Sequence, residues 1–305
     1  MNVGSVDSRA LRVGFIGAGR AANALAPGLH DKGYQVTSVS SRTLASAEAV
    51  AGRIQRCTPL AAPQDVADGC DLVFITAPDD SIETIAQSVR WHSGMWVTHC
   101  SGVESASVLE CAQEQGAIIG SFHPMQTFAT TNQETAILSG IAFAVEGTSP
   151  LIDTLREMAH ALGGWPVEIS PQHRALYHLS GFLACGAVVT LMSQAAELWK
   201  IIGYTKEQGL EVLIPILKST VASLEAQGTP GALTGPISRG DLGTVQKHLD
   251  ALEGQAPSIL PIYCEIALGS VALSRDKGGI KHTKEQEITT LLEERLAKAR
   301  TLFVG

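Results

Sequence analysis

Histidine, arginine and aspartate side chains in separate segments have the chemistry needed to move a proton and to hold a carboxylate. His178 lies in the segment Tyr177–Gly181, and Arg239 and Asp241 lie in a later turn rich in glycine and proline. An imidazole exchanges protons near neutral pH, so His178 is our candidate for protonating an oxyanion formed from a carbonyl. We expect Arg239 to bind a substrate carboxylate and Asp241 to orient one of these two groups. The alternative for that turn is an ion pair or a helix cap.

Two more polar segments follow apolar runs that are typical of strands. His123 precedes Pro124, and Ser101 follows the run that ends at His99. Polar residues at strand ends are placed to meet a ligand, so His123 and Ser101 are further candidate site residues. A structural histidine fixed before proline is the alternative for His123, and a helix cap is the alternative for Ser101. The histidines lack a short ligand spacing such as H-E-x-x-H, so we expect no metal site.

A glycine turn near the start of the chain predicts a dinucleotide site. The residues Gly17-Ala18-Gly19-Arg20-Ala21-Ala22 fit the pattern G-x-G-x-x-A directly after an apolar run. In this pattern the first glycine permits a tight turn, the second lets a pyrophosphate approach the backbone, and the small third residue allows close helix packing. The N–H groups at the helix start then face the phosphates. A glycine turn without a ligand is the alternative.

The residues after the second apolar run favour NADP(H) over NAD(H). An acidic residue would hold the ribose hydroxyls at this position, but the chain has Ser40-Ser41-Arg42-Thr43. A guanidinium and hydroxyl groups suit a 2′-phosphate, although Arg42 as an ordinary solvated side chain is the alternative. Ala77 and Pro78 follow a third run, where they would pack against the cofactor, while Asp79 and Asp80 bind there or cap the next helix. The candidate cofactor residues are Gly17, Ala18, Gly19, Arg20, Ala21, Ser41, Arg42, Thr43, Ala77, Pro78 and Ser101.

The elements that position these residues alternate between strand and helix in the first part of the chain. Short apolar runs alternate with segments that have helical periodicity, which predicts a doubly wound, mainly parallel sheet with crossover helices. The expected strands are residues 11–16, 35–40, 71–77, 96–99, 117–121, 141–145 and 165–169. The expected helices are 19–30, 45–53, 80–89, 103–113 and 150–162. This α/β Rossmann domain is predicted to cover residues 1–170.

From Pro171 onward the pattern is helical, with no clear strand. The expected helices are residues 173–202, 206–226, 244–252, 257–274 and 284–302, which predicts an all-helical domain over residues 171–305. Some of these helices carry more apolar surface than a small domain can bury, so we expect a homodimer formed through this domain.

Composition limits the partners and the compartment. The formal net charge of −8 and the lack of a basic run argue against a nucleic-acid partner. The chain has six cysteines and no C-x-x-C pair, which suggests the reducing cytoplasm. The longest uninterrupted apolar stretch, residues 181–192, is shorter than the ~20 residues of a membrane span, so no membrane segment is expected.

Several motifs together resemble a known family of Rossmann-like oxidoreductases with a C-terminal helical domain of unknown function. They are G-A-G-R-A-A at 17–22, S-S-R-T at 40–43, F-H-P-M-Q-T-F at 122–128, Y-H at 177–178 and L-T-G-P-I-S-R-G-D at 233–241. The resemblance implies a C-terminal domain similar to that of 6-phosphogluconate dehydrogenase, in a superfamily that includes ketopantoate and pyrroline-5-carboxylate reductases. It also implies a dimer and NADP dependence. Ketopantoate reductases carry a lysine where this chain has Arg174, so the proton would have to come from His178 or from a water that it positions.

These observations lead to one main hypothesis and two alternatives. The main one is an NADP(H)-dependent oxidoreductase that reduces a small 2-oxo acid similar to ketopantoate. The first alternative is a reductase of imines or of a pyrroline carboxylate. The second is a non-catalytic NADP(H)-binding sensor or partner-binding protein.

Overall fold

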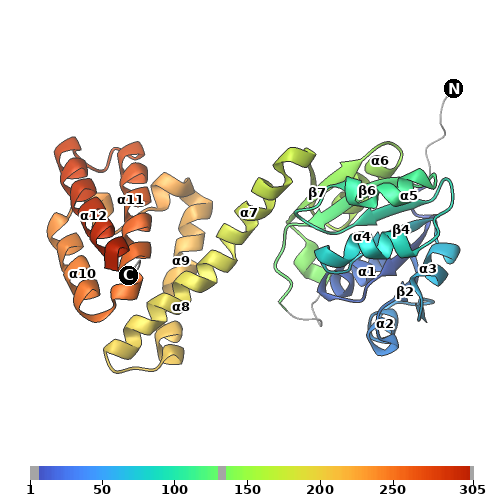
Figure 1. Cartoon of the computed structure of the whole chain (residues 1–305), viewed down its shortest axis with the longest axis horizontal. Helices are drawn as coiled ribbons and strands as arrows, with labels where there is room; N and C mark the ends of the chain where they lie inside the picture. Colours follow the sequence, from blue (N-terminus) through green and yellow to red (C-terminus); the bar gives the residue numbers. More distant parts are fainter. Residues whose placement is uncertain (1–6, 130–134, 303–305) are drawn as a thin grey trace. The chain divides into compact units, whose positions relative to one another are not determined.

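The computed structural model describes residues 7–129 and 135–302 of the chain, which form two compact units (Figure 1). The first unit comprises Met1–Gly186 and the second Ala187–Gly305. The division between the two units falls after Gly186. The domain boundary that the sequence pattern places at Ser170–Pro171, where the helices begin, stays a prediction. Residues 171–186 pack with the first unit.

An eight-stranded sheet forms the centre of the first unit, with strand order β3-β2-β1-β4-β5-β6-β7-β8. Neighbouring strands pair in parallel except β6 and β7, which are antiparallel. The strands are β1 (Arg12–Ile16), β2 (Gln35–Ser40), β3 (Thr58–Leu60), β4 (Leu72–Ile75), β5 (Trp96–His99), β6 (Ile118–Pro124), β7 (Ala142–Gly147) and β8 (Trp165–Glu168). The order starts in the middle and runs outward in both directions, which is the doubly wound arrangement expected from the sequence.

Helices cover both faces of this sheet because the central strands are apolar on both sides. In β4, Leu72 and Phe74 belong to one core cluster, and Val73 and Ile75 belong to the other. The α-helices of this unit are α1 (Arg20–Asp31), α2 (Leu44–Ala51), α3 (Pro63–Gly69), α4 (Asp79–Ser88), α5 (Glu110–Glu114), α6 (Leu151–Ala161) and α7 (Arg174–Ala184). Short 3₁₀ turns are η1 (Ala106–Leu109), η2 (Thr135–Leu138) and η3 (Pro171–His173).

Three features of this unit were not predicted. The strand β3 has three residues and includes Pro59, so it shows no alternation. The helix α3 begins at Pro63, has seven residues and lacks an apolar stripe. The antiparallel pairing of β7 also has no local signature, because it depends on the path of the chain between β6 and β7.

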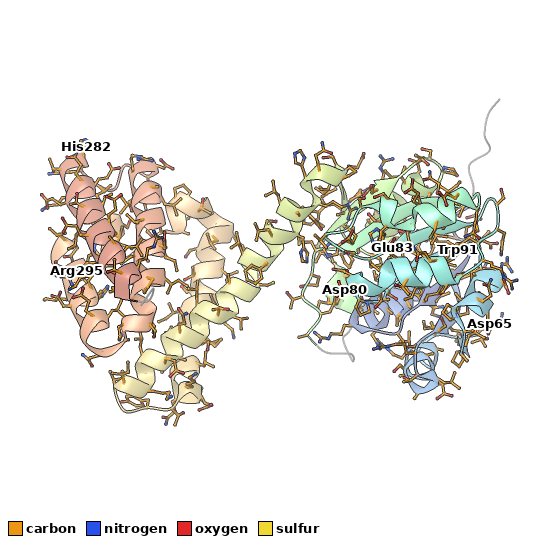
Figure 2. The ribbon with its side chains drawn as sticks, in the orientation of Figure 1. Asp65, Asp80, Glu83, Trp91, His282 and Arg295 are labelled. Atoms are coloured by element: carbon orange, nitrogen blue, oxygen red, sulfur yellow. The ribbon has the colours of Figure 1, made fainter. Side chains whose placement is uncertain are left out.

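The second unit is entirely helical in its described part, as predicted. It contains α8 (Gly186–Ile201), α9 (Lys206–Ala232), η4 (Ile237–Arg239), α10 (Leu242–Gln255), η5 (Pro257–Ile259), α11 (Leu260–Asp276) and α12 (His282–Leu302). Helices α10, α11 and α12 share one apolar core. Arg295 of α12, labelled in Figure 2, forms ion pairs with Asp250 and Glu253 of α10. The bundle thus has both an apolar and an ionic link between its helices.

The long helix predicted over residues 173–202 is interrupted. Helix α7 ends at Ala184, and Cys185 has backbone angles of φ −121° and ψ −68°, outside the helical region. Helix α9 runs beyond the predicted end at residue 226 and contains a kink at Gly228, with φ 68°. Apolar periodicity continues across Cys185, so the sequence pattern gave no sign of the first break. The kink at Gly228 lies just after the predicted end at residue 226, where Gly228 and Pro230 disfavour a helix.

By length and composition, two helical stretches could cross a membrane: Pro171–Ile201 and Pro257–Asp276. The first stretch is longer than the apolar run at residues 181–192 because it includes the flanking turns of helix. Apolar helices at a core or an interface meet the same criterion. The absence of a membrane segment therefore stays a prediction.

Candidate functional site

The glycine turn lies between β1 and α1 and is held by both neighbouring strands. The N–H of Gly17 donates to the carbonyl of Ser40 at 2.8 Å, and the hydroxyl of Thr76 donates to the carbonyl of Gly17 at 2.7 Å. Gly17 has φ 109°, and a Cβ there would lie 2.8 Å from the carbonyl oxygen of Thr76. The backbone conformation and the contact with Thr76 therefore require glycine at this position, whether or not a ligand binds.

Gly19 differs from Gly17 because the protein leaves space beside it. A Cβ on Gly19 would meet Thr76 only at 3.6 Å, an ordinary contact, and its φ of −76° is open to any residue. The open space lies at the start of α1, where backbone N–H groups are free to bind an anion. The hydroxyl of Ser40, which lines the same cleft, is buried and lacks a hydrogen-bond partner among the described residues. An open glycine and an unpaired hydroxyl fit a ligand at this turn.

A cleft of about 410 Å³ runs from the glycine turn to the end of β2. Its lining includes most of the predicted cofactor residues, namely Gly17, Ala18, Gly19, Ser41, Arg42, Ala77 and Pro78. Arg42 is exposed, and Ser46 of α2 lines the same end. This end presents a guanidinium and hydroxyl groups, and no carboxylate is among its lining residues, so it can accept a phosphate.

Four predicted cofactor residues are not part of this lining: Arg20, Ala21, Thr43 and Ser101. The guanidinium of Arg20 donates to the carbonyl of Phe128 at 3.2 Å. Thr43 precedes α2 and bonds through its hydroxyl to that of Ser46. The hydroxyl of Ser101 accepts from the N–H groups of Val103 and Glu104. These bonds do not cap a helix, because the next helical turn, η1, begins at Ala106 and is capped by Ser105.

Asp79 and Asp80 form the first turn of α4, and Figure 2 labels Asp80 there. They do not occupy the N-cap position, which is Pro78. Their negative charges instead complement the partial positive charge of the helix start.

A second pocket, of about 380 Å³, contains His123 and His178. His123 is the penultimate residue of β6, and His178 lies one turn into α7. Their ring centroids are 6.2 Å apart. Met125, Gly181 and Phe182 supply apolar walls. The structure therefore brings two of the four predicted catalytic residues together within the first unit.

Gly102 makes room for the two imidazoles. A Cβ on this residue would lie 2.8 Å from Nε2 of His123 and 2.7 Å from Cδ2 of His178. Any side chain at residue 102 would therefore occupy the space beside both rings. Gly181 likewise leaves space for the side chain of Met125, because a Cβ on Gly181 would lie 2.9 Å from the Sδ of Met125.

The electrostatic environment keeps His123 neutral. Burial, together with the nearby His178, Arg174 and His99, lowers the pKa of His123 to about 3. Nδ1 of His123 lies 2.9 Å from the hydroxyl of Tyr177. Burial raises the pKa of Tyr177 to about 12, so this phenol keeps its proton. At neutral pH the pair His123 and Tyr177 is uncharged.

Arg174 anchors the helix that carries Tyr177 and His178. Its guanidinium is completely buried and forms an ion pair with Glu146 of β7, with Nε and Oε2 2.8 Å apart. It also donates to the hydroxyl of Ser121 and to the carbonyl of Ser101. Because its guanidinium is bonded to these protein groups, Arg174 is not available as a substitute for a catalytic lysine.

Arg239 and Asp241 belong to the second unit. Arg239 ends η4 and is exposed. Asp241 precedes α10 and accepts hydrogen bonds from the N–H and the hydroxyl of Thr244, which lower the pKa of its carboxyl group. Asp241 is thus a helix cap, the alternative considered for this turn. A role for either residue with a substrate stays a prediction.

Sequence reasoning missed several residues that shape the site. They are Ser46, Thr76, Gly102, Ser121, Glu146 and Tyr177. Tyr177 had a usable signal, because Arg174, Tyr177 and His178 are spaced i, i+3 and i+4 and so share one helix face. Glu146 and Ser121 had no such signal in the sequence. Their bonds to Arg174 depend on the pairing of β6 with β7.

No group of three or more possible metal ligands occurs among residues 7–129 and 135–302. Both ring nitrogens of His99 have hydrogen-bond partners in the protein. Nδ1 accepts from the N–H of Ser101, and Nε2 bonds to the carbonyl of Ser105. Burial, opposed by the bond to Ser105, lowers the pKa of His99 to about 4.

Structural comparison shows that known oxidoreductases share this fold. A Bacteroides fragilis protein named as an NADP oxidoreductase is 24% identical, with a TM-score of 0.66 over 89% of this chain and 99% of that one. A reductive aminase from Aspergillus terreus, solved with NADPH and ethyl-5-oxohexanoate, is 15% identical, with a TM-score of 0.59 over 94% of each chain. A 1-pyrroline-5-carboxylate reductase from Streptococcus pyogenes is 16% identical, with a TM-score of 0.56 over 95% and 98%. No curated protein matches the sequence.

Two family models match consecutive parts of the chain. Residues 2–124 match a Rossmann-like domain, and residues 141–269 match a domain of unknown function, DUF2520. The second match begins at the edge of β7 and continues through α7 into the helical unit. The chain therefore carries a match to a Rossmann-like domain followed by a match to DUF2520, the combination that its motifs resemble.

Proposed function

We propose that this protein is an NADP(H)-dependent oxidoreductase that reduces a small 2-oxo acid, similar to ketopantoate, by hydride transfer. The observation that carries the proposal is the single cleft that joins the open glycine turn at Gly19 to Arg42. Such a cleft can accept a pyrophosphate at one end and a 2′-phosphate at the other. The named activities of the structural neighbours support the same class of reaction.

Each part of the cofactor has candidate partners. The backbone of Gly17, Ala18 and Gly19 would hold the pyrophosphate, Ser41 and Arg42 the 2′-phosphate, and Ala77 and Pro78 would pack against the rest. When bound, the reduced nicotinamide supplies the hydride. The other four candidate cofactor residues would contact the cofactor at the margin of this cleft or through their backbone. They are Arg20, Ala21, Thr43 and Ser101.

The pocket of His123 and His178 would hold the reacting carbonyl. His178 is exposed, so it can recover a proton from water after giving one to the oxyanion. His123 is neutral and can donate one hydrogen bond to the same oxygen. Arg239 remains our candidate for the substrate carboxylate, with Asp241 holding its turn in place.

A reductase of imines or of a pyrroline carboxylate is the second candidate. It is favoured by the neighbours named as reductive aminase and pyrroline-5-carboxylate reductase. The pocket lining also supports it: the residues that form the pocket of His123 and His178 include no lysine or arginine, so a neutral or cationic substrate would fit.

NADPH oxidation across a substrate panel tests both candidates. The panel contains ketopantoate, other 2-oxo acids, cyclic imines, and ketones supplied with an amine. Turnover of a 2-oxo acid alone supports the first candidate, and turnover of imines alone supports the second. NADPH binding without turnover of any compound would favour a non-catalytic NADPH-binding protein instead.

The second unit supports a homodimer. Helix α9 has 27 residues but only one, Gly209, is buried, and in α8 only Ala196 is buried. Both helices expose large apolar side chains, among them Val189 and Ile201 of α8 and Ile216 of α9. A helix that is apolar but uncovered is expected to be covered by a partner. The six free cysteines support a reducing compartment, and we propose the cytoplasm.

A further inference from the structure

Tyr177 and His123 form a hydrogen bond whose direction has consequences for the site. The hydroxyl of Tyr177 lies 2.9 Å from Nδ1 of His123, and the two rings meet edge to face with centroids 5.6 Å apart. The residues come from different elements, the end of β6 and the first half of α7. Both are held firmly, because Arg174, one turn before Tyr177, is tied to β7 and to Ser121 of β6.

The chemistry of the two groups decides which one donates. A phenol is a stronger acid than a neutral imidazole N–H, and an imidazole nitrogen is a stronger base than a phenol oxygen. If Nδ1–H donated, the half-buried hydroxyl of Tyr177 would need another acceptor, and none occurs among its contacts with the described residues. Donation from Tyr177 to Nδ1 satisfies both groups.

We propose that Tyr177 is a positioning residue that donates to Nδ1 of His123 and thereby keeps the imidazole proton on Nε2. That edge of the ring faces the space left open by Gly102, where a Cβ would lie 2.8 Å from Nε2. The same space borders His178. The N–H of His123 is therefore presented at the wall of the pocket that both histidines line.

The two histidines consequently have different tasks. His123 remains neutral and offers a fixed hydrogen-bond donor. His178 is exposed and remains our candidate for protonating the oxyanion. A neutral imidazole can polarise a carbonyl without giving up its proton. This division of tasks rests on the proposed reductase function, but the position of the proton on His123 does not.

Nitrogen NMR tests the position of the proton directly. The protein is labelled with ring-¹⁵N histidine, and the signals of His123 among the nine histidines are assigned by their loss in His123→Gln. At neutral pH we expect Nδ1 to have a pyridine-like shift and Nε2 a pyrrole-like shift. In Tyr177→Phe, both tautomers should become populated. A proton on Nδ1 in the wild-type protein, or an unchanged tautomer in Tyr177→Phe, would overturn the proposal.

The chain offers a matched control outside the site. Nδ1 of His248 lies 3.1 Å from the hydroxyl of Tyr263 in the helical unit, and Tyr263→Phe should leave the spectrum of His123 unchanged. With a substrate from the panel, Tyr177→Phe should lower kcat roughly 10- to 100-fold. A His123 with a mixed tautomer would lose part of the roughly 10²–10³-fold that one fixed hydrogen-bond donor to an oxyanion contributes. The KM for NADPH should stay within about twofold.

The two proposals fail in different ways. If the panel contains no substrate, the reductase function fails, while the NMR result still decides the tautomer. If turnover is found but Tyr177→Phe retains the wild-type kcat, the positioning role fails and the reductase function stands.

Discussion

Arg174 and Glu146 form an ion pair in which the guanidinium is completely buried, whereas the carboxylate side chain retains 19% of its exposure. The pair joins the start of α7 to the antiparallel strand β7, at the point where the sheet ends its parallel run. Because Tyr177 and His178 follow within four residues, this bond fixes the helix turn that carries both side chains.

The two partners of this ion pair should differ in their contribution to stability. Glu146→Ala leaves a buried guanidinium without a counter-charge, so we expect a loss of about 3–5 kcal/mol in the free energy of unfolding. Arg174→Met leaves a carboxylate that water can reach, so its loss should be smaller. Arg156→Met is the control, because Arg156 forms exposed ion pairs that are worth about 0–1 kcal/mol. Urea denaturation measures all three, and equal losses in Glu146→Ala and Arg156→Met would contradict the anchoring role.

Gly102→Ala should damage the site more than the fold. The added methyl group would lie within 2.8 Å of both imidazoles, so the rings must move, at a cost of about 1–3 kcal/mol in stability. We expect kcat to fall at least about tenfold, as for a displaced proton donor, with NADPH affinity unchanged. Gly69→Ala is the control, because nothing lies within 4 Å of a Cβ there. Wild-type kcat in Gly102→Ala would show that the two rings do not act together.

Regular elements of the fold could be predicted from the sequence because they depend on local patterns. Seven of the eight strands in the described residues overlap a predicted strand, and the glycine turn has a fixed spacing. The strand β3 could not be predicted, because Pro59 breaks its pattern. The strand β7 was expected at residues 141–145, but its antiparallel direction could not be predicted, because long-range pairing with β6 determines it.

The candidate site was predictable only in part, for a related reason. Residues at strand ends, such as Arg42 and Ala77, could be identified because parallel strands bring their ends to one edge. The ion pair between Arg174 and Glu146 could not be identified from the sequence, because the two residues are far apart in the chain and neither lies in a motif. Asp241 was ambiguous because a helix cap and a binding residue have the same local sequence.

Two histidines of the first unit, the buried His99 and the partly buried His123, make the free energy of unfolding depend on pH. Their folded pKa values, about 3 for His123 and about 4 for His99, lie below the ordinary value of about 6.5. Below about pH 6.5 the unfolded chain binds protons that the folded protein does not, so stability is complete above that pH. It is lost as the pH falls toward 4 and 3, by up to about 1.4 kcal/mol per pH unit for each histidine.

Urea denaturation at several pH values between 5 and 7.5 checks this dependence. His123→Gln should reduce the slope of stability against pH, because one of the two contributing groups is removed. His160→Gln, at an exposed position, should leave the slope as in the wild type. A slope that is the same in all three proteins would mean that His123 is not held neutral by the fold.

Arg42→Ala tests the choice of cofactor. Loss of charge-assisted hydrogen bonds to a 2′-phosphate, worth about 1.5–3 kcal/mol, should raise the Kd for NADPH about 10- to 100-fold. The Kd for NADH should change less than about threefold, since NADH has no phosphate at that position. Isothermal titration with both dinucleotides measures the difference, and Arg90→Ala, an exposed arginine outside the cleft lining, is the control. Equal weakening of both dinucleotides would contradict the assignment of Arg42.

Ile216→Glu should separate the proposed dimer. Ile216 is 60% exposed on α9, a helix with a single buried residue, so a partner would have to cover it. A carboxylate placed in an apolar interface should raise the dimer dissociation constant about 30-fold or more, which corresponds to a hot-spot loss of about 2 kcal/mol. Light scattering after size-exclusion chromatography measures the mass at several concentrations. Gln286→Glu adds the same charge to the exposed face of α12 and should leave the dimer intact. A wild-type protein that is monomeric at micromolar concentration would refute the dimer, and an Ile216→Glu variant that stays dimeric would place the interface elsewhere.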